Sequence, residues 1–245
     1  INKIFNLNPS HRKYKNMKHG DFSSLADNYS KFRPGYSERV LDAVIGMLPN
    51  PAQDSVFADI GAGTGIWTRI VANRGFAHVY AVEPNENMRV NGIADSKEFS
   101  IEWISGTGES TGLPDKSIDL LTMASSFHWV DFDKGINEFT SKLKPGGIFV
   151  ALWNPRLLKV TPVLEKIHNY MEQLKPDMKR ISSGSSEFAE KLNDRLHSTG
   201  KFIDIVYVEA KHSMWMDKES YIGVWKSVND VQVQLGEKLF KDFLD

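Results

Sequence analysis

Residues 59–65, Asp-Ile-Gly-Ala-Gly-Thr-Gly, constrain this chain more than any other segment. The apolar residues 55–60 before them read as a short buried strand, and residues 65–73 after them read as a helix. Glycine lets a backbone turn tightly and approach a ligand where a Cβ atom would clash. The backbone N–H groups at the start of the following helix face the same space. The segment therefore predicts a ligand-binding turn between a strand and a helix.

Strand-like and helix-like segments alternate around this turn, which predicts an α/β fold with a doubly wound, mostly parallel sheet. Ligands of such sheets bind beyond the carboxyl ends of the strands. Helices are expected from about residue 85 and over about 131–143. Further strands are expected at 78–83, 100–105, 117–124, 148–153 and 202–210.

Two regions fall outside the alternation. Residues 22–48 read as two helices interrupted at 33–35, and we expect an N-terminal helical lid there. Residues 155–200, after strand five, read as a polar helical insertion with a Ser/Gly-rich break at 182–186, and we expect it to cap the carboxyl ends of the strands. We interpret residues 1–16 as a leader or disordered segment and residues 17–245 as one domain.

Bulk composition excludes several classes of site. There is no cysteine, so thiolate metal sites and cysteine nucleophiles are excluded, and no two of the seven histidines lie at ligand spacing near a carboxylate; we expect no metal. The formal net charge of −1 argues against a nucleic-acid partner. No apolar run approaches the roughly 20 residues that cross a bilayer, so we expect a cytoplasmic protein without a membrane partner.

The turn does not match either common phosphate-binding pattern. A dinucleotide turn needs glycine where Ile66 stands, and a P-loop needs lysine directly after Gly65. A turn preceded by Asp59 suits a ligand with no phosphate and a cationic end. Glu83 ends the second strand and can accept hydrogen bonds from both ribose hydroxyls, and the loop 106–109 after the third strand can hold an adenine. The alternative is a strand-to-helix turn with no ligand.

Four segments resemble, in order, the cofactor motifs of class I S-adenosylmethionine-dependent methyltransferases: VFADIGAGTG, VYAVEPNENM, SGTGESTGLPDKSIDLLTMASSFHWVD and LKPGGIFVALW. The resemblance covers about residues 20–155. Phe-His-Trp at 127–129 and Tyr-Ser-Lys-Phe-Arg-Pro at 29–34 are most similar to the small-molecule branch that includes trans-aconitate methyltransferase. The resemblance implies a Rossmann-like methyltransferase sheet, S-adenosylmethionine as cofactor with S-adenosylhomocysteine as product, and a small-molecule acceptor. It also implies a final antiparallel strand, for which only 214–216 is a short candidate.

The same resemblance implies which residues bind the cofactor. The glycine turn would hold the methionine part, Glu83 the ribose, the loop 107–109 the adenine, and Ser125 and Phe127 would lie beside the sulfonium. The N-terminal helices would fold over it. The implied cofactor-binding residues are Tyr29, Arg33, Asp59, Gly61, Ala62, Gly63, Glu83, Pro84, Asn85, Met88, Thr107, Gly108, Glu109, Ser125 and Phe127.

The acceptor side is less defined by the sequence. His128 is a candidate general base for a hydroxyl or amine acceptor; the alternative is a histidine that shapes the pocket or packs on Trp129. A carboxylate acceptor needs no base. The candidate substrate-binding residues are Tyr36, Trp129, Trp153, Asn154 and Arg156.

The expected reaction is in-line displacement of the methyl group onto a carboxylate or hydroxyl, with alignment of the two partners as the main catalytic contribution. Three alternatives remain at this point. One is a methyltransferase acting on tRNA or protein, and another is a cofactor-binding protein without transfer activity. The third, a nicotinamide-dependent oxidoreductase, is disfavoured by the missing third glycine of the turn.

Overall fold

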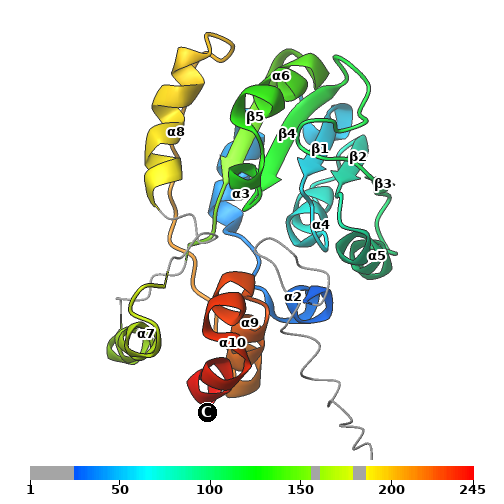
Figure 1. Cartoon of the computed structure of the whole chain (residues 1–245). Coiled ribbons are helices and arrows are strands. Elements are labelled where there is room, and N and C mark those ends of the chain that lie inside the picture. Colours follow the sequence, from blue (N-terminus) through cyan, green and yellow to red (C-terminus); the bar gives the residue numbers. More distant parts are fainter. Residues whose placement is uncertain (1–24, 156–160, 179–185) are drawn as a thin grey trace, which may run out of the picture.

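The chain forms a parallel β-sheet with helices on both faces. A separate group of helices lies beyond the carboxyl ends of the strands (Figure 1). The computed structural model describes residues 25–155, 161–178 and 186–245. The expected leader at 1–16 lies outside these residues, as does Arg156. The Ser/Gly break falls largely outside them, because α8 begins at Ser186. The described residues contain no helix long and apolar enough to span a membrane.

Within the described residues, five strands make the sheet, in the order β3-β2-β1-β4-β5, and every neighbouring pair is parallel. The order reverses direction between β1 and β4, which is the position where sheets of this kind bind ligands. The strands are β1 (Val56–Ile60), β2 (His78–Val82), β3 (Glu102–Ile104), β4 (Ile118–Ala124) and β5 (Leu143–Leu152).

The helices follow the expected alternation. Short 3-10 helices are η1 (Ala52–Asp54) and η2 (Phe127–Trp129). The α-helices are α2 (Ala26–Phe32), α3 (Glu38–Gly46), α4 (Ile66–Ala72), α5 (Glu86–Asp95), α6 (Phe132–Lys142), α7 (Pro162–Leu174), α8 (Ser186–Ser198), α9 (Lys218–Lys226) and α10 (Asn229–Leu244).

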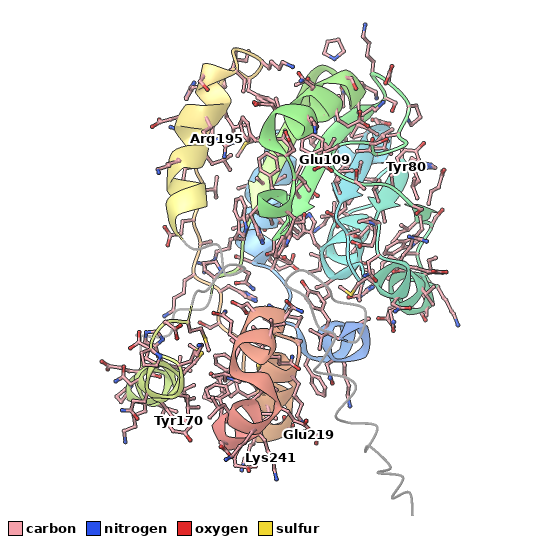
Figure 2. All side chains as sticks on the ribbon, viewed as in Figure 1. Tyr80, Glu109, Tyr170, Arg195, Glu219 and Lys241 are labelled. Carbon is pink, nitrogen blue, oxygen red and sulfur yellow. The ribbon has the colours of Figure 1, made fainter. Side chains whose placement is uncertain are left out.

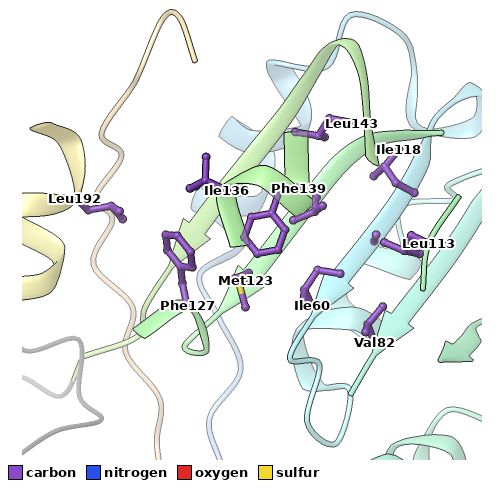
Figure 3. Close-up of a cluster of buried hydrophobic side chains, with 12 residues drawn as sticks. Ile60, Val82, Leu113, Ile118, Met123, Phe127, Ile136, Phe139, Leu143 and Leu192 are labelled. Carbon is purple, nitrogen blue, oxygen red and sulfur yellow. The ribbon is translucent and has the colours of Figure 1, made fainter. Parts of the chain in front are cut away.

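Each face of the sheet packs into its own apolar cluster. A central strand is therefore buried on both sides, and its residues are mostly apolar. Six of the seven residues of β4 are buried. On one face, Leu41 of α3 and Trp67 of α4 pack against the sheet. On the other, Ile136 and Phe139 of α6 and Leu192 of α8 complete the cluster drawn in Figure 3. The sheet is thereby a rigid platform whose strand ends can position a site.

A second group of helices lies beyond the carboxyl ends of the strands (Figure 1). We call α2, α7, α9 and α10 the cap. Its apolar cluster is built from Met171 of α7, Trp225 of α9 and Val231 of α10, among others, and it is separate from the sheet clusters. Phe32 joins α2 to this group, since its ring fills the space where a Cβ on Gly223 would stand, 2.3 Å away.

The insertion after β5 divides between the two layers, contrary to the expectation that all of it caps the strand ends. Figure 2 shows Tyr170 of α7 beside the cap helices and Arg195 of α8 beside the sheet. The guanidinium of Arg195 lies 3.8 Å from the centre of the Phe132 ring on α6. Thus α7 belongs to the cap, whereas α8 covers a face of the sheet.

The expected strand at 202–210 is wrong for this structure. These residues run without regular secondary structure, although Phe202 packs against Phe149 of β5. Ile203 and Tyr207 are 86% and 85% exposed. The alternating apolar pattern has strand propensity, but a strand exists only where a neighbour accepts its hydrogen bonds, and no described residue does so here.

Candidate functional site

The glycine turn joins the ends of β1, β2 and β4. Gly61 and Gly63 have φ of +68° and +60°, which a residue with a Cβ rarely adopts. The backbone N–H groups of Gly61 and Ala62 donate to the carbonyl of Val82, at 2.8 and 3.0 Å. A Cβ on Gly61 would lie 2.6 Å from the Cβ of Ser126. The turn is therefore held in one conformation at the switch point of the sheet.

Glu83 bridges the turn and the start of α5. Its Oε2 accepts from the N–H of Gly63 and its Oε1 from the N–H of Asn85, both at 2.8 Å. The residue is 7% exposed, and burial raises the pKa of its carboxyl. A carboxylate oxygen has two lone pairs, so each oxygen can accept one further hydrogen bond. This geometry fits the ribose diol expected from the sequence.

Asp59 lies beneath the turn rather than on its surface. Its two oxygens accept from the hydroxyls of Thr68, at 2.6 Å, and Thr122, at 3.1 Å, and the residue is fully buried. The indole N–H of Trp67 in turn donates to Thr122. Burial raises the pKa of Asp59 to about 7, against the lowering effect of both hydroxyls. Asp59 thus supplies a buried, titratable acid under the turn, with both oxygens already hydrogen-bonded.

One polar atom of the turn has no hydrogen-bond partner in the described part of the chain. The Thr64 hydroxyl is buried and makes no hydrogen bond with the described residues. Native proteins leave few buried polar atoms unpaired, so such an atom next to a glycine turn indicates a ligand or water. The side chain of Met88 covers the turn from α5, 3.4 Å from where a Cβ on Gly63 would stand. The residues present fit a small ligand with a diol and a cationic end.

A hollow of about 520 Å³ adjoins the turn between α2, α4 and α5. Arg69 connects the two, since its guanidinium lines the hollow and donates to the carbonyl of Thr64 at 2.7 Å. The other lining residues are Ser30, Lys31, Asn91 and Asp95.

The loop after β3 is fixed to the start of α6. The hydroxyl of Thr107 accepts from the N–H groups of Glu109 and Ser110, and Glu109 Oε1 accepts from the N–H of Asp131 at 2.8 Å. A Cβ on Gly108 would lie 2.4 Å from a methyl of Val130. Val130 thus fills the space beside Gly108. The side chains of Thr107 and Pro84, which follow β3 and β2, are exposed to solvent.

The segment between α2 and α3 is held on three sides. Arg33 donates to the Oγ of Ser227, at 2.9 Å, and also to its carbonyl, at 3.3 Å. The Asn154 amide donates to the carbonyl of Gly35 at 2.7 Å. The Tyr36 hydroxyl lies 3.0 Å from the Oγ of Ser125. The structure therefore brings the predicted Arg33, Tyr36, Ser125 and Asn154 together at the strand ends.

Tyr29 and Ser125 add two details to this arrangement. The guanidinium of Arg33 stacks over the ring of Tyr29, 4.8 Å from its centre. Ser125 has φ of +59°, a strained value for a residue with a side chain. Strain of this kind is retained mainly where the surroundings enforce it, often at binding sites. Burial raises the pKa of Tyr36 well above its usual range, so this residue remains a neutral hydroxyl.

His128 contacts two of the predicted substrate-binding residues, Trp153 and Trp129. Trp153 Nε1 donates to His128 Nδ1 at 3.3 Å, and the ring of Trp129 lies 4.8 Å from the imidazole. Burial lowers the pKa of His128 to about 4. The ring is therefore neutral at physiological pH and a weaker base than the sequence alone suggests. Trp129 is 43% exposed.

One predicted residue lies elsewhere. The ring of Phe127 is fully buried among Phe132, Phe139 and Phe149 in the sheet cluster, so it does not lie on the surface of the turn. An aromatic residue directly after a central strand has apolar partners on the sheet face, which is the stronger attraction. Arg156 lies outside the described residues.

Sequence reasoning missed other members of the site. Thr68 and Thr122 are separated from Asp59 by 9 and 63 positions, and Ser227 is 194 positions from Arg33. Thr68 had a usable signal, because its spacing in the helix after the turn directs its hydroxyl back toward the strand. Ser227 had none, since no local pattern specifies a contact with α2.

The described residues contain no cluster of acidic or histidine side chains suited to a metal ion.

Comparison with known proteins agrees with this geometry. Residues 58–151 match the family model described as a methyltransferase domain. An uncharacterized methyltransferase from Mycobacterium tuberculosis is 33% identical over 135 residues, or 55% of this chain and 52% of that protein. The chain thus spans about half the length of the first curated relatives that it matches.

Two other similar proteins cover more of the chain. The ubiquinone/menaquinone biosynthesis C-methyltransferase UbiE of Bartonella bacilliformis is 27% identical over 190 residues. The matched segment covers 71% of this chain and 71% of UbiE. A putative methyltransferase from an antibiotic biosynthesis pathway of Anabaena variabilis has a solved structure with a TM-score of 0.60 and 26% identity, covering 84% of this chain and 82% of that one. The predicted methyltransferase fold is confirmed by these comparisons, and the family implies S-adenosylmethionine as cofactor.

Proposed function

We propose that this chain, whose residues 58–151 match a methyltransferase-domain model, transfers a methyl group from S-adenosylmethionine to a small-molecule acceptor. The observation that carries the proposal is the bridge made by Glu83 between Gly63 and Asn85 at the switch point of the sheet. It presents two carboxylate oxygens to a diol and keeps negative charge near the turn, where a cationic ligand is favoured.

Each part of the site has a role in this proposal. Gly61, Ala62, Gly63 and Thr64 hold the methionine part, with Asp59 acting from beneath the turn through its charge. Glu83 binds the ribose, and the exposed edge around Pro84 and Thr107 receives the adenine. Bound there, S-adenosylmethionine supplies a methyl group on a sulfonium, which is a good leaving group. The protein aligns the acceptor and excludes water, and alignment can contribute about 7–11 kcal/mol in the best intramolecular cases.

A small acceptor is supported by two observations. The chain has a formal net charge of −1, so it lacks the basic bias typical of tRNA-binding surfaces. UbiE, a relative at 27% identity, is named for a step in ubiquinone and menaquinone biosynthesis. A carboxylate or hydroxyl acceptor, membership of the trans-aconitate methyltransferase-like branch and a cytoplasmic location stay predictions.

The cap is proposed to close the site. Phe32 connects α2 to α9, Arg33 binds Ser227 at the C-terminal end of α9, and Tyr36 connects the same segment to the end of β4. Two packed helices from opposite ends of the sequence can separate for exchange of cofactor and then exclude water. Hydrogen exchange in α2 and α9 should therefore slow when S-adenosylhomocysteine binds, whereas exchange in α8 should change little.

Two measurements test the function. Calorimetry should show binding of S-adenosylhomocysteine and none of NAD; the reverse result would overturn the proposal. Methyl-labelled S-adenosylmethionine is then incubated with the protein and separate small-molecule, tRNA and protein fractions. A reaction without the protein is the blank, and Glu83→Ala is the variant with weakened cofactor binding. Label should enter the small-molecule fraction. Cofactor binding without label in any fraction would indicate a binding protein without transfer activity.

A further inference from the structure

His128 lies at the carboxyl ends of the strands, where the methyl acceptor is expected to bind. It belongs to η2, which directly follows β4, and Trp153 directly follows β5, the next parallel strand. Both residues therefore lie at the carboxyl edge of the sheet, which faces the cap (Figure 1). Ser125, three positions before His128, contacts Tyr36 at the same edge.

The hydrogen bond with Trp153 determines which nitrogen of His128 carries the proton. An indole N–H can only donate, so Nδ1 of His128, 3.3 Å away, must accept. A neutral imidazole with an accepting Nδ1 has its hydrogen on Nε2. Burial lowers the pKa of the ring to about 4, which keeps it in this neutral form.

The Nε2–H group of this tautomer has no hydrogen-bond partner among the described residues. The atom is buried, and no described residue accepts a hydrogen bond from it. A buried donor left unpaired is costly, and native structures rarely keep one without a ligand or an ordered water. The surrounding geometry thus provides a single N–H donor, fixed in direction by Trp153 and by the adjacent Trp129 ring.

We propose that His128 is an acceptor-binding residue whose Nε2–H donates a hydrogen bond to an oxygen of the methyl acceptor. The inference rests on the proposed function and narrows its substrate class to molecules with a carbonyl, carboxylate or hydroxyl oxygen near the methylated atom. It replaces the role of general base, because neither nitrogen of this tautomer has a free lone pair: Nε2 carries hydrogen and Nδ1 accepts from Trp153. His128 thereby selects and orients the acceptor.

Nitrogen NMR of the histidine side chains tests the tautomer directly. The chain has seven histidines, and the signal absent from His128→Gln identifies residue 128. We expect a neutral ring with hydrogen on Nε2 at pH 6 and pH 8 in the wild type, and a mixture of tautomers in Trp153→Phe. A proton on Nδ1, or a doubly protonated ring at pH 6, would overturn the proposal.

Matched ligands test the donor role in the protein saturated with S-adenosylhomocysteine. Benzoate and benzamide present an oxygen acceptor, whereas toluene has the same ring without one. The Nε2–H signal should shift with benzoate or benzamide and not with toluene. If neither oxygen ligand moves it, or toluene moves it equally, the proposal fails.

Three variants separate the hydrogen bond from simple packing. Glutamine carries an N–H at about the reach of Nε2, whereas asparagine has only the reach of Nδ1. His128→Gln should bind benzoate within about threefold of the wild type, and His128→Asn and His128→Ala should bind it about tenfold more weakly, the scale of one hydrogen bond. Equal binding by all three, or equal loss in all three, would contradict the role. Affinity for S-adenosylhomocysteine should be unchanged in each, so a failure of cofactor binding would count against the proposed function instead.

Discussion

The cofactor side of the site and the cap differ in how far apart along the chain their contacts are made. Around the glycine turn, the bond from Gly63 to Glu83 joins residues 20 positions apart, and that from Asn85 to Glu83 joins residues two apart. In the cap, Arg33 and Ser227 are separated by 194 positions. Contacts between residues that are near in the sequence can be recognised as a motif. A contact between distant residues gives no such pattern, because each partner stands alone in its own segment. This difference explains why the cofactor is easier to identify from the sequence than the acceptor.

Truncation should give the largest effect and tests whether the cofactor side works without α2, one of the four cap helices. Removal of residues 1–36 deletes the contacts of Arg33 and Tyr36 and should abolish binding of S-adenosylhomocysteine in calorimetry. Removal of residues 1–16 should leave the dissociation constant unchanged. A folded protein that lacks residues 1–36 and still binds normally would show that the cofactor side does not depend on α2.

Asp59→Asn should change the pH dependence of stability. The pKa of Asp59 is raised to about 7 from 3.8, so the native state holds this proton more tightly than the unfolded state does. The stabilisation is complete below pH 4 and is lost as pH rises toward 7, by up to about 4 kcal/mol. Asparagine stays neutral, so urea unfolding should find the variant more stable than the wild type at pH 8 and similar at pH 4.

The exposed Asp54→Asn is the control for this experiment and should keep the pH dependence of the wild type. A parallel pH dependence in Asp59→Asn and the wild type would remove Asp59 as its source. The cap should unfold in the same transition if the two regions are thermodynamically coupled.

Glu83→Ala tests the cofactor side alone. The loss of a charged hydrogen-bond acceptor should weaken binding of S-adenosylhomocysteine by about 1.5–3 kcal/mol. Glu86, exposed in the first turn of α5, provides the control, and Glu86→Ala should bind normally. An unchanged dissociation constant for Glu83→Ala would remove this carboxylate from the site.

Gly223→Ala tests the cap alone and should have the smallest effect on cofactor affinity. Its Cβ would stand 2.3 Å from the ring of Phe32, which forces α2 away from α9. Overpacking of this kind costs about 1–3 kcal/mol of unfolding free energy. In Gly46→Ala the new Cβ meets no atom within 4 Å, so chemical denaturation should show a gain of up to about 1 kcal/mol. Stability restored by Phe32→Ala in the Gly223→Ala background would assign the loss to this contact.

Much of the sheet could be predicted from the sequence. Apolar runs such as that of β4 identify buried strands, and glycine and proline mark their ends, so the alternation of β1 to β5 with α4 to α6 is as expected. Strand 202–210 was mispredicted because strand propensity does not supply a pairing partner. The insertion was assigned to one layer because its helices are both amphipathic, and only tertiary packing separates α7 from α8.

The site was predictable to the same degree. The glycine turn could be predicted because a tight turn requires glycine, and the structure places Glu83 beside it. Its binding of a ribose diol stays a prediction. The burial of Asp59 beneath two threonine hydroxyls depends on side-chain packing that spacing alone does not specify. The tautomer of His128 depends on Trp153, a residue of another strand.

The pairing of α2 with α9 also sets an order of events during synthesis. At about 5–20 residues per second, α2 leaves the ribosome roughly 10–40 s before α9 does. All five strands are complete by Leu152, so the sheet and the turn can form while Phe32 still lacks the partner it will find at Gly223. A nascent chain therefore passes through a stage with a finished platform and an open cap. Chaperones that bind exposed aromatic side chains would meet α2 during that interval.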